Sequence, residues 1–245
     1  MLSSFVRPIT TQALAAVLLL CLCGSSALAQ TMPKNLASFD HRKYHFGFLL
    51  SANSSSFNID FAPDYTFEDS LLSIENKALQ GFNLALLASL DITPMVHLRF
   101  LPGLSFQDRG LVYRFRSEDG TILTEDKRTE SVYLEFPFML KLRTRRMGNF
   151  APYALVGAKF GRDMQSQSGV SQAFDKDLVI KLKPNDSSLD LGAGADFFLP
   201  FFKFSVELKT AFGFNNVLIQ DGSIYSSAID QLRTRAFVIS FSFEG

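Results

Sequence analysis

The sequence predicts an all-β fold, an eight-stranded antiparallel transmembrane β-barrel with long outer loops and short periplasmic turns. Eight segments of about ten residues carry apolar side chains at every second position, which is the period of a strand with one lipid-facing side. Long and short connections alternate between these segments. Hydrophobic residues make up 47% of the chain, yet no run after residue 29 approaches the ~20 apolar residues of a membrane helix. A closed sheet is the all-β way to satisfy every backbone polar group in lipid.

The first element is a secretory signal at residues 1–29. It has a positive charge at Arg7, an apolar stretch and the small-x-small cleavage site Ala27-Leu28-Ala29. The chain beyond this site has no cysteine, so we expect neither a disulfide nor a Cys-ligated metal. Residues 30–43 form a periplasmic N-terminal lead, either a flexible tether or a docking strand, and residues 44–245 form the barrel.

The first strand shows the pattern that predicts all eight. Phe46 and Phe48 occupy one face, and His45 and Ser51 occupy the other. The same separation of apolar from polar, glycine or ionisable residues recurs in each later segment. We therefore expect strands at residues 44–53, 81–92, 96–106, 132–142, 154–161, 188–199, 204–214 and 234–243.

The middle strands justify the barrel over its main alternative, a soluble sandwich. In strands two, five and six, glycine is frequent on the polar side, as at Gly81, Gly157 and Gly192. An interior too narrow for a side chain at every position accounts for this, whereas a solvated face favours Lys, Glu and Thr. Pro102 and Pro137 fall inside strands three and four, where we expect a bulge or a strand boundary.

The connections predict the orientation of the barrel. Barrels of the outer membrane keep short turns on the periplasmic side, so both termini are expected to face the periplasm. Long outer loops are expected at residues 54–79, 107–130, 163–187 and 215–232. Within the second loop an Asp119-Gly120 turn signal predicts a β-hairpin above the membrane.

Ionisable residues on the inward parity define a candidate lumen network. An eight-stranded barrel has room for little more than its own side chains, so folded cargo cannot pass through it. Buried charges persist mainly by pairing, and a charge-paired plug is therefore favoured over a proton or ion relay. The network has four acids and four bases: Arg99, Glu135, Lys141, Lys159, Asp190, Asp196, Glu207 and Lys209.

Two surface segments are candidates for partner contact. Arg143, Arg145 and Arg146 form a basic turn that suits an acidic partner subunit or lipid phosphates, although a solvated turn explains it too. The first outer loop combines carboxylates with aromatic residues, among them Asp64, Tyr65 and Phe67. Such a loop suits protein recognition, or alternatively caps the mouth of the barrel.

The sequence argues against several other functions. Asp190 and Asp196 are six residues apart, or ~20 Å along one strand, which is too far for a two-carboxylate mechanism. All three histidines, His41, His45 and His97, map to the periplasmic ends, so the outer loops lack a base for a hydrolase. We expect no catalytic residues, cofactor, metal or small-molecule substrate. Balanced charge also gives no reason to expect a nucleic-acid partner.

Five segments spread over the mature chain resemble the PorT family. They are residues 41–48, 101–106, 133–137, 201–207 and 212–216, and the chain also ends in an aromatic-rich strand, 237–243, similar to the insertion signal of outer-membrane barrels. The resemblance implies an outer-membrane component of the type IX secretion system, which exports proteins with a C-terminal sorting domain and supports gliding where it occurs. Its implied partners are outer-membrane lipid, other secretion subunits and, indirectly, the exported proteins.

Two other functions remain open at this stage. A small adhesin-like or envelope-tethering barrel uses its outer loops without any secretion partner. A lipid-modifying barrel enzyme is disfavoured by the absence of an outer histidine.

Overall fold

The computed structural model describes residues 33–62, 71–117, 119–165, 181–220 and 224–245. The chain divides into residues 1–33 and 34–245, and the fold below is that of the second unit. Its elements are η2 (Phe39–His41), β1 (Tyr44–Phe61), β2 (Leu71–Asp91), β3 (Val96–Phe100), β4 (Gly103–Arg116), β5 (Ile122–Arg143), β6 (Phe150–Asp163), β7 (Asn185–Phe198), β8 (Lys203–Gly213), α2 (Ile224–Ser227) and β9 (Ile229–Glu244). The helices among the described residues are all too short or too polar to cross a membrane.

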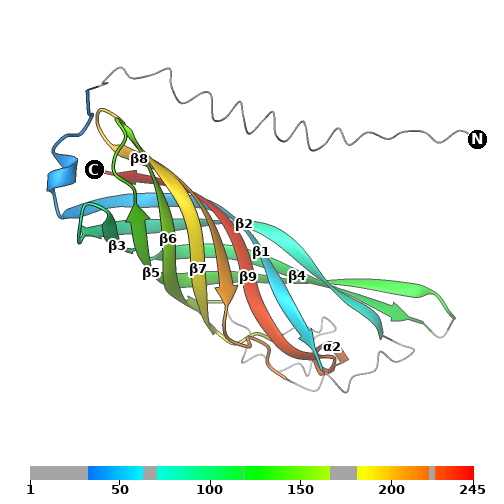
Figure 1. The fold of residues 1–245 in the computed structure, drawn as a ribbon. Coiled ribbons are helices and arrows are strands. Elements are labelled where there is room, and N and C mark those ends of the chain that lie inside the picture. Colours follow the sequence, from blue (N-terminus) through cyan, green and yellow to red (C-terminus); the bar gives the residue numbers. More distant parts are fainter. Residues whose placement is uncertain (1–32, 63–70, 118, 166–180, 221–223) are drawn as a thin grey trace, which may run out of the picture. The chain divides into compact units, whose positions relative to one another are not determined.

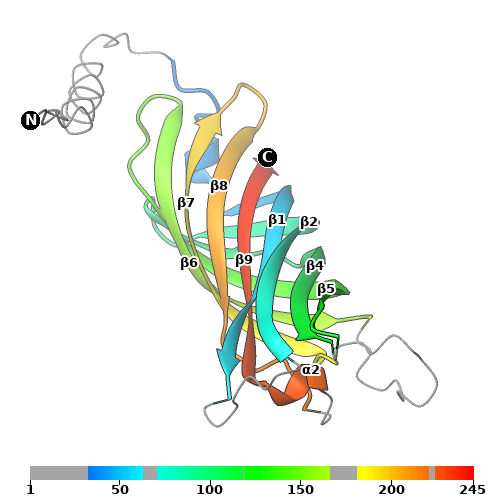
Figure 2. The same cartoon turned by 90° about the vertical axis from the view of Figure 1, so that its right-hand side faces the viewer.

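The strands form one closed antiparallel ring (Figures 1 and 2). β1 pairs with β9 on one side and with β2 on the other, which closes the sheet. β3 and β4 both lie between β2 and β5 and keep the same register, so they are two halves of one wall strand. The wall of the ring therefore has eight strand positions, and the predicted eight-stranded barrel is confirmed.

The two prolines behave differently. Pro102 lies between the end of β3 at Phe100 and the start of β4 at Gly103, so the expected strand boundary is confirmed there. At Pro137 the expectation is wrong, because β5 continues through it. The carbonyl of Pro137 accepts a hydrogen bond from the Leu101 N–H, with 3.1 Å between nitrogen and oxygen. The missing N–H of Pro137 is therefore on the side that faces the break between β3 and β4. No hydrogen bond between paired strands is lost there.

Several strands are longer than predicted. β1 continues to Phe61 and β2 begins at Leu71, so most of the outer loop expected at residues 54–79 is strand. Beyond Ser55 and Leu79 the β1–β2 pairing stops, but β2 still pairs with β4, and β4 with β5. The predicted hairpin is confirmed, and its turn places Gly120 at a φ of 77°, a conformation that favours glycine.

The two ends of the ring are distinct (Figure 1). At one end, here called the hairpin end, β4 and β5 project beyond the other strands. At the opposite end, here called the cap end, lie residues 34–43 and the C-terminal Gly245, whose N–H donates to the Phe46 carbonyl. The short β2–β3, β5–β6 and β7–β8 connections are at the cap end.

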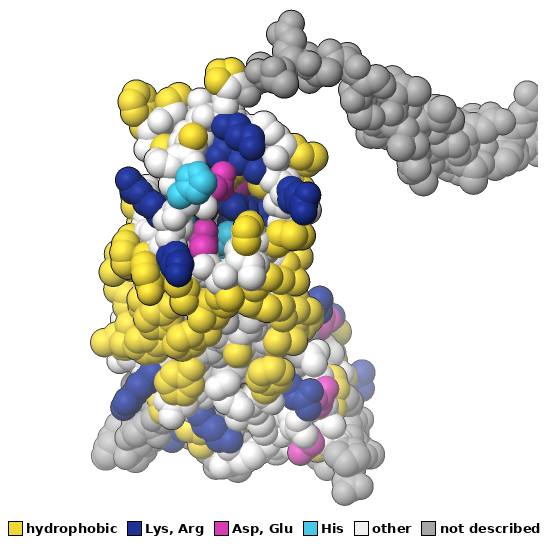
Figure 3. Space-filling view, turned by 60° about the vertical axis from the view of Figure 1, so that its left-hand side comes forward, with side chains coloured by type: hydrophobic (Ala, Val, Ile, Leu, Met, Phe, Trp, Pro, Cys, Tyr) yellow, Lys and Arg dark blue, Asp and Glu magenta, His cyan; other side chains and the backbone are white. Residues whose placement is uncertain are grey.

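An apolar belt surrounds the ring. Phe46 and Leu86 are each 68% exposed, whereas the alternating residue His45 is only 1% exposed. Figure 3 shows this belt as a yellow band on the face in view. Aromatic pairs such as Phe48–Phe243 stack across neighbouring strands within it. Large apolar side chains on the outside and polar ones inside are the arrangement that lipid requires of a barrel wall.

A separate apolar core fills the hairpin end. Its members come from strands beyond the belt and from two connections, and they include Tyr113, Leu182, Leu218 and Ile229. Leu182 and Leu218 also form an isolated backbone bridge. These contacts close the ring at the hairpin end with packed side chains.

Glycines on the inward face allow strands and side chains to approach closely. A Cβ atom added at Gly194 would lie 2.6 Å from the Val206 carbonyl oxygen and 2.7 Å from the Tyr153 hydroxyl. Both distances are below van der Waals contact, and the first involves backbone that cannot move aside.

We therefore expect Gly194→Ala to lower the free energy of unfolding by about 1–3 kcal/mol, the usual cost of overpacking. Denaturant unfolding of the protein in detergent micelles measures this. The control is Gly110→Ala, whose Cβ would have three Lys77 side-chain carbons as its nearest neighbours, the closest being Lys77 Cβ at 3.1 Å. Equal stability of the two variants would contradict the close packing seen at Gly194.

Candidate functional site

The lumen near the cap end holds a cluster of buried ions, here called the Arg99 network: Arg99, Lys203, Glu207, Lys209 and Glu244. Arg99 contacts Glu207 at 2.5 Å and Glu244 at 3.2 Å. Lys203 contacts Glu244 at 2.7 Å, and Lys209 contacts Glu207 at 3.2 Å. Because the side chains of Arg99 and both glutamates are fully buried, each charge depends on the others for compensation.

A second ion pair lies beside this network. Lys141 Nζ is 2.7 Å from Asp196 Oδ1, and the Ser205 hydroxyl donates to the same oxygen at 2.6 Å. The Lys141 ammonium also lies 3.7 Å from the centre of the Tyr153 ring. Tyr153 in turn donates its hydroxyl to Glu207 at 2.8 Å, which links the pair to the Arg99 network.

An apolar layer packs inside the ring beside these ions. The layer consists of buried residues that pack together with Tyr153 inside the ring: Leu49, Leu87, Leu101, Met139 and Leu155. Along β5, Met139 lies between Lys141 and Glu135, so the layer crosses the lumen between two charged groups. The layer contains no ionisable group at the middle of the bore except for the phenol of Tyr153.

On the other side of this layer, Glu135 is the centre of the remaining polar contacts. It accepts hydrogen bonds from Lys159 at 3.0 Å and from Gln107 at 2.9 Å. Asp190 accepts from the Ser188 hydroxyl at 2.9 Å. Arg109 donates to the side-chain oxygen of Gln107, and its guanidinium lies 5.2 Å from the Tyr133 ring centre.

The structure places all eight residues of the predicted lumen network inside the ring. Seven of them have an ion-pair partner, and Asp190 is held by Ser188. Sequence reasoning missed Lys203 and Glu244, which lie one residue outside the predicted strands. Lys203 lies two residues before the inward-facing Ser205, and Glu244 lies two residues after the inward-facing Ser242. This period of two is the sequence signal that identifies them.

Little free volume remains between these side chains. Two cavities reach the lumen groups, one of about 20 Å³ beside Glu135 and Arg109 and one of about 40 Å³ beside Asp190 and Lys209. A water molecule needs about 10–15 Å³ on this scale, so each cavity holds at most a few waters. The bore is closed to anything larger in this conformation.

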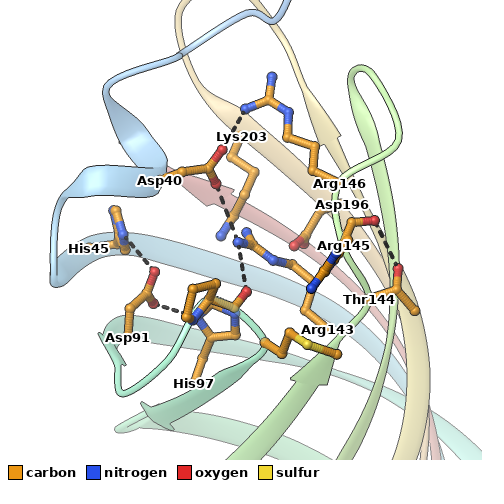
Figure 4. Close-up of polar contacts among 12 residues, drawn as sticks. Asp40, His45, Asp91, His97, Arg143, Thr144, Arg145, Arg146, Asp196 and Lys203 are labelled. Carbon is orange, nitrogen blue, oxygen red and sulfur yellow. Dashed lines mark hydrogen bonds and ion pairs between the residues drawn. The ribbon is translucent and has the colours of Figure 1, made fainter.

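The N-terminal lead packs on the cap end (Figure 4). The Phe39 ring stacks on His45 with 3.7 Å between ring centres, and it also contacts Ala151 and Phe198. Asp40 accepts from Arg143 and Arg146, each at 3.3 Å. From residue 34 onward the lead is thus a packed cap on the ring, rather than the free tether or docking strand considered from the sequence.

The basic turn is divided by these contacts. Arg143 is buried and Arg146 lies over the Phe198 ring at 3.7 Å, so both hold the cap. Arg145 is exposed, and no carboxylate of the described residues forms an ion pair with it. Asp64, Tyr65 and Phe67, the other predicted contact residues, lie outside the described part of the chain.

Two histidines share one carboxylate near the cap. Asp91 lies 3.3 Å from His45 Nε2 and 2.5 Å from His97 Nδ1, as Figure 4 shows. The described residues contain no group of three or more His, Cys, Asp or Glu side chains arranged to hold a metal. The Asp91 carboxylate orients both imidazoles, and because His45 stacks on Phe39, this contact supports the position of the cap.

A closed antiparallel ring with an apolar belt defines an integral β-barrel of the outer membrane. A family model described as "Outer membrane protein beta-barrel domain" matches residues 28–218, and the chain belongs to this family. No curated protein matches the chain significantly.

Solved structures with a similar fold come from two bacteria. Ail, the attachment invasion locus protein of Yersinia pestis, solved with the heparin analogue sucrose octasulfate, is 13% identical, with a TM-score of 0.39. The match covers 83% of this chain and 100% of Ail. OprG from Pseudomonas aeruginosa is also 13% identical, with a TM-score of 0.38, and the match covers 83% of this chain and 96% of OprG.

The Arg99 network makes a sharp stability prediction. Arg99→Met removes the cation that Glu207 and Glu244 share and leaves each of these buried glutamates with a single lysine partner, so we expect a loss of about 3–5 kcal/mol in unfolding free energy. Denaturant titration in micelles measures the loss. The control Arg114→Met breaks a half-exposed pair with Glu75 and should cost less than about 1 kcal/mol. Comparable losses in both variants would show that the lumen ions are solvated rather than buried.

Proposed function

We propose that the protein is a non-enzymatic outer-membrane component of the type IX secretion system. In this role it is needed for export of cargo with a C-terminal sorting domain, and for gliding where present. It acts as an assembly or accessory subunit and not as the pore. The resemblance of five segments, from residue 41 to residue 216, to the PorT family supports the assignment to this system.

The closed bore is the observation that carries the accessory role. The Arg99 network and the apolar layer fill the lumen, and the two cavities that reach its ions have volumes of about 20 and 40 Å³. A protein with such an interior works through surfaces at its two ends and not through its lumen.

The proposal includes an orientation and a division of the chain. Residues 1–29 are removed as a signal, residues 30–43 lead into the barrel, and residues 44–245 form it. The cap end then faces the periplasm, since the short connections and both ends of the barrel unit are found there. The hairpin end faces outward.

Deletion of the gene in the native bacterium tests the proposal. We expect proteins with the type IX sorting domain to accumulate in the periplasm, because their export lacks a required subunit, while other outer-membrane proteins stay at normal levels. Quantitative proteomics of periplasm, surface and medium measures this.

Complementation makes the same experiment specific. The wild-type gene should restore export, and Arg145→Glu at the exposed rim of the cap end should restore it less well if this rim meets a periplasmic subunit. Arg116→Glu at the hairpin end is the matched charge control. Normal export in the deletion strain would refute the secretion role.

An adhesin-like or envelope-tethering barrel is the second candidate. It is favoured by the hairpin end, where β2, β4 and β5 extend beyond the closed ring as a sheet. Cross-strand ion pairs such as Arg114–Glu75, at 2.8 Å, reinforce this sheet outside the belt. Under this alternative, the deletion changes adhesion or envelope integrity and leaves cargo export intact.

A further inference from the structure

An open groove at the cap end includes Arg145 of the basic turn, and no ligand has yet been assigned to the groove as a whole. Its volume is about 670 Å³, and its walls are the lead, the β2–β3 turn and the β5–β6 turn. The groove is far larger than the lumen cavities and opens outward from the ring. It therefore has room for a ligand of the size of a lipid headgroup.

The groove has a large excess of positive charge. Six lysine and arginine side chains line it, against the two carboxylates of Asp40 and Asp91. Asp40 is shared by Arg143 and Arg146, and Asp91 is held by the two buried histidines. Among the described residues, no ion pair is recorded for the other four cations, Lys34, Arg42, Lys43 and Arg145.

These four cations surround the groove from different segments. Lys34, Arg42 and Lys43 lie on the lead, while Arg145 lies across the groove on the β5–β6 turn, and all four are exposed. Asp40 holds the lead to this turn through Arg143 and Arg146, so the two sides of the groove are fixed relative to each other (Figure 4). A prearranged set of cations binds an anion at a lower entropic cost than free side chains do.

The groove also adjoins the lipid-facing belt. Ile92 lines it and is 58% exposed, and Tyr44, directly after Lys43, is 64% exposed. Figure 3 shows Lys and Arg side chains gathered at the end of the barrel next to the yellow band. A ligand in this position meets cations with one part and the apolar belt with another.

From this arrangement we propose that the groove binds the phosphate headgroup of an anionic membrane lipid, whose acyl chains lie along the belt beside Ile92 and Tyr44. An acidic peptide segment explains the cations, but it does not explain why the groove continues into the lipid-facing surface. The proposal does not depend on the secretion role, since any barrel with this rim binds such a lipid.

Native mass spectrometry of the mature protein in detergent tests the proposal. Phosphatidylglycerol is the anionic probe, phosphatidylcholine is the zwitterionic probe, and inorganic phosphate is the free anion. We expect the wild type to prefer phosphatidylglycerol. The triple variant Arg42→Gln, Lys43→Gln, Arg145→Gln should bind it about tenfold or more weakly, because each cation near an anionic headgroup contributes to binding.

The matched control is Arg116→Gln, Arg162→Gln, Lys183→Gln, which removes the same charge from exposed positions at the hairpin end. It should keep the wild-type preference. Three results would overturn the proposal: no preference for phosphatidylglycerol, an equal loss in both triple variants, or binding of inorganic phosphate without the lipid. Stronger binding of a glutamate-rich peptide than of the lipid would also overturn it, in favour of a protein-docking groove.

Discussion

The ion pairing of Arg99 with Glu207 and Glu244 is the interaction on which the interior of this barrel depends. The wall faces lipid, so the inward side chains can neither be solvated by bulk water nor turn outward. Three fully buried charges remain compatible with the fold only because they compensate one another. Lys203 joins the start of β8 to the end of β9 through Glu244, and Arg99 joins both strands to β3, so the same network ties three strands together inside the ring.

The closed interior divides the molecule into a rigid middle and two functional ends. The apolar layer around Met139 fills part of the bore, and along β5 it lies between the charged groups of Lys141 and Glu135. At the cap end, Phe39 and Asp40 attach the lead to the ring and create a groove rich in unpaired cations. At the hairpin end, packed apolar residues close the ring below a projecting sheet. Recognition of lipid or protein is therefore expected at the ends.

Much of the barrel follows from the sequence, because the lipid-facing wall imposes a strict period of two. The same period marks Arg99 and Glu207 as inward residues. The ends of the strands are harder to predict. β1 and β2 leave the belt after Ser55 and before Leu79, where apolar and polar side chains no longer need to alternate. Lys203 and Glu244 lie just beyond the periodic segments. The apolar layer is also hidden, since Leu49 and Met139 on the inward parity resemble breaks in the pattern. The cap is formed by a short segment without periodicity that packs on the ring. No pattern in the neighbouring sequence predicts that Phe39 stacks on His45.

Ion conductance across a planar lipid bilayer tests the closed interior most directly. A barrel filled by paired ions and an apolar layer should show no steady single-channel conductance after insertion, at moderate voltage and at neutral pH. Insertion itself is verified by protease protection of the same protein in vesicles. Regular conductance steps from the inserted wild-type protein would mean that the lumen is an open, water-filled channel, and the view of a sealed barrel that works through its ends would be wrong.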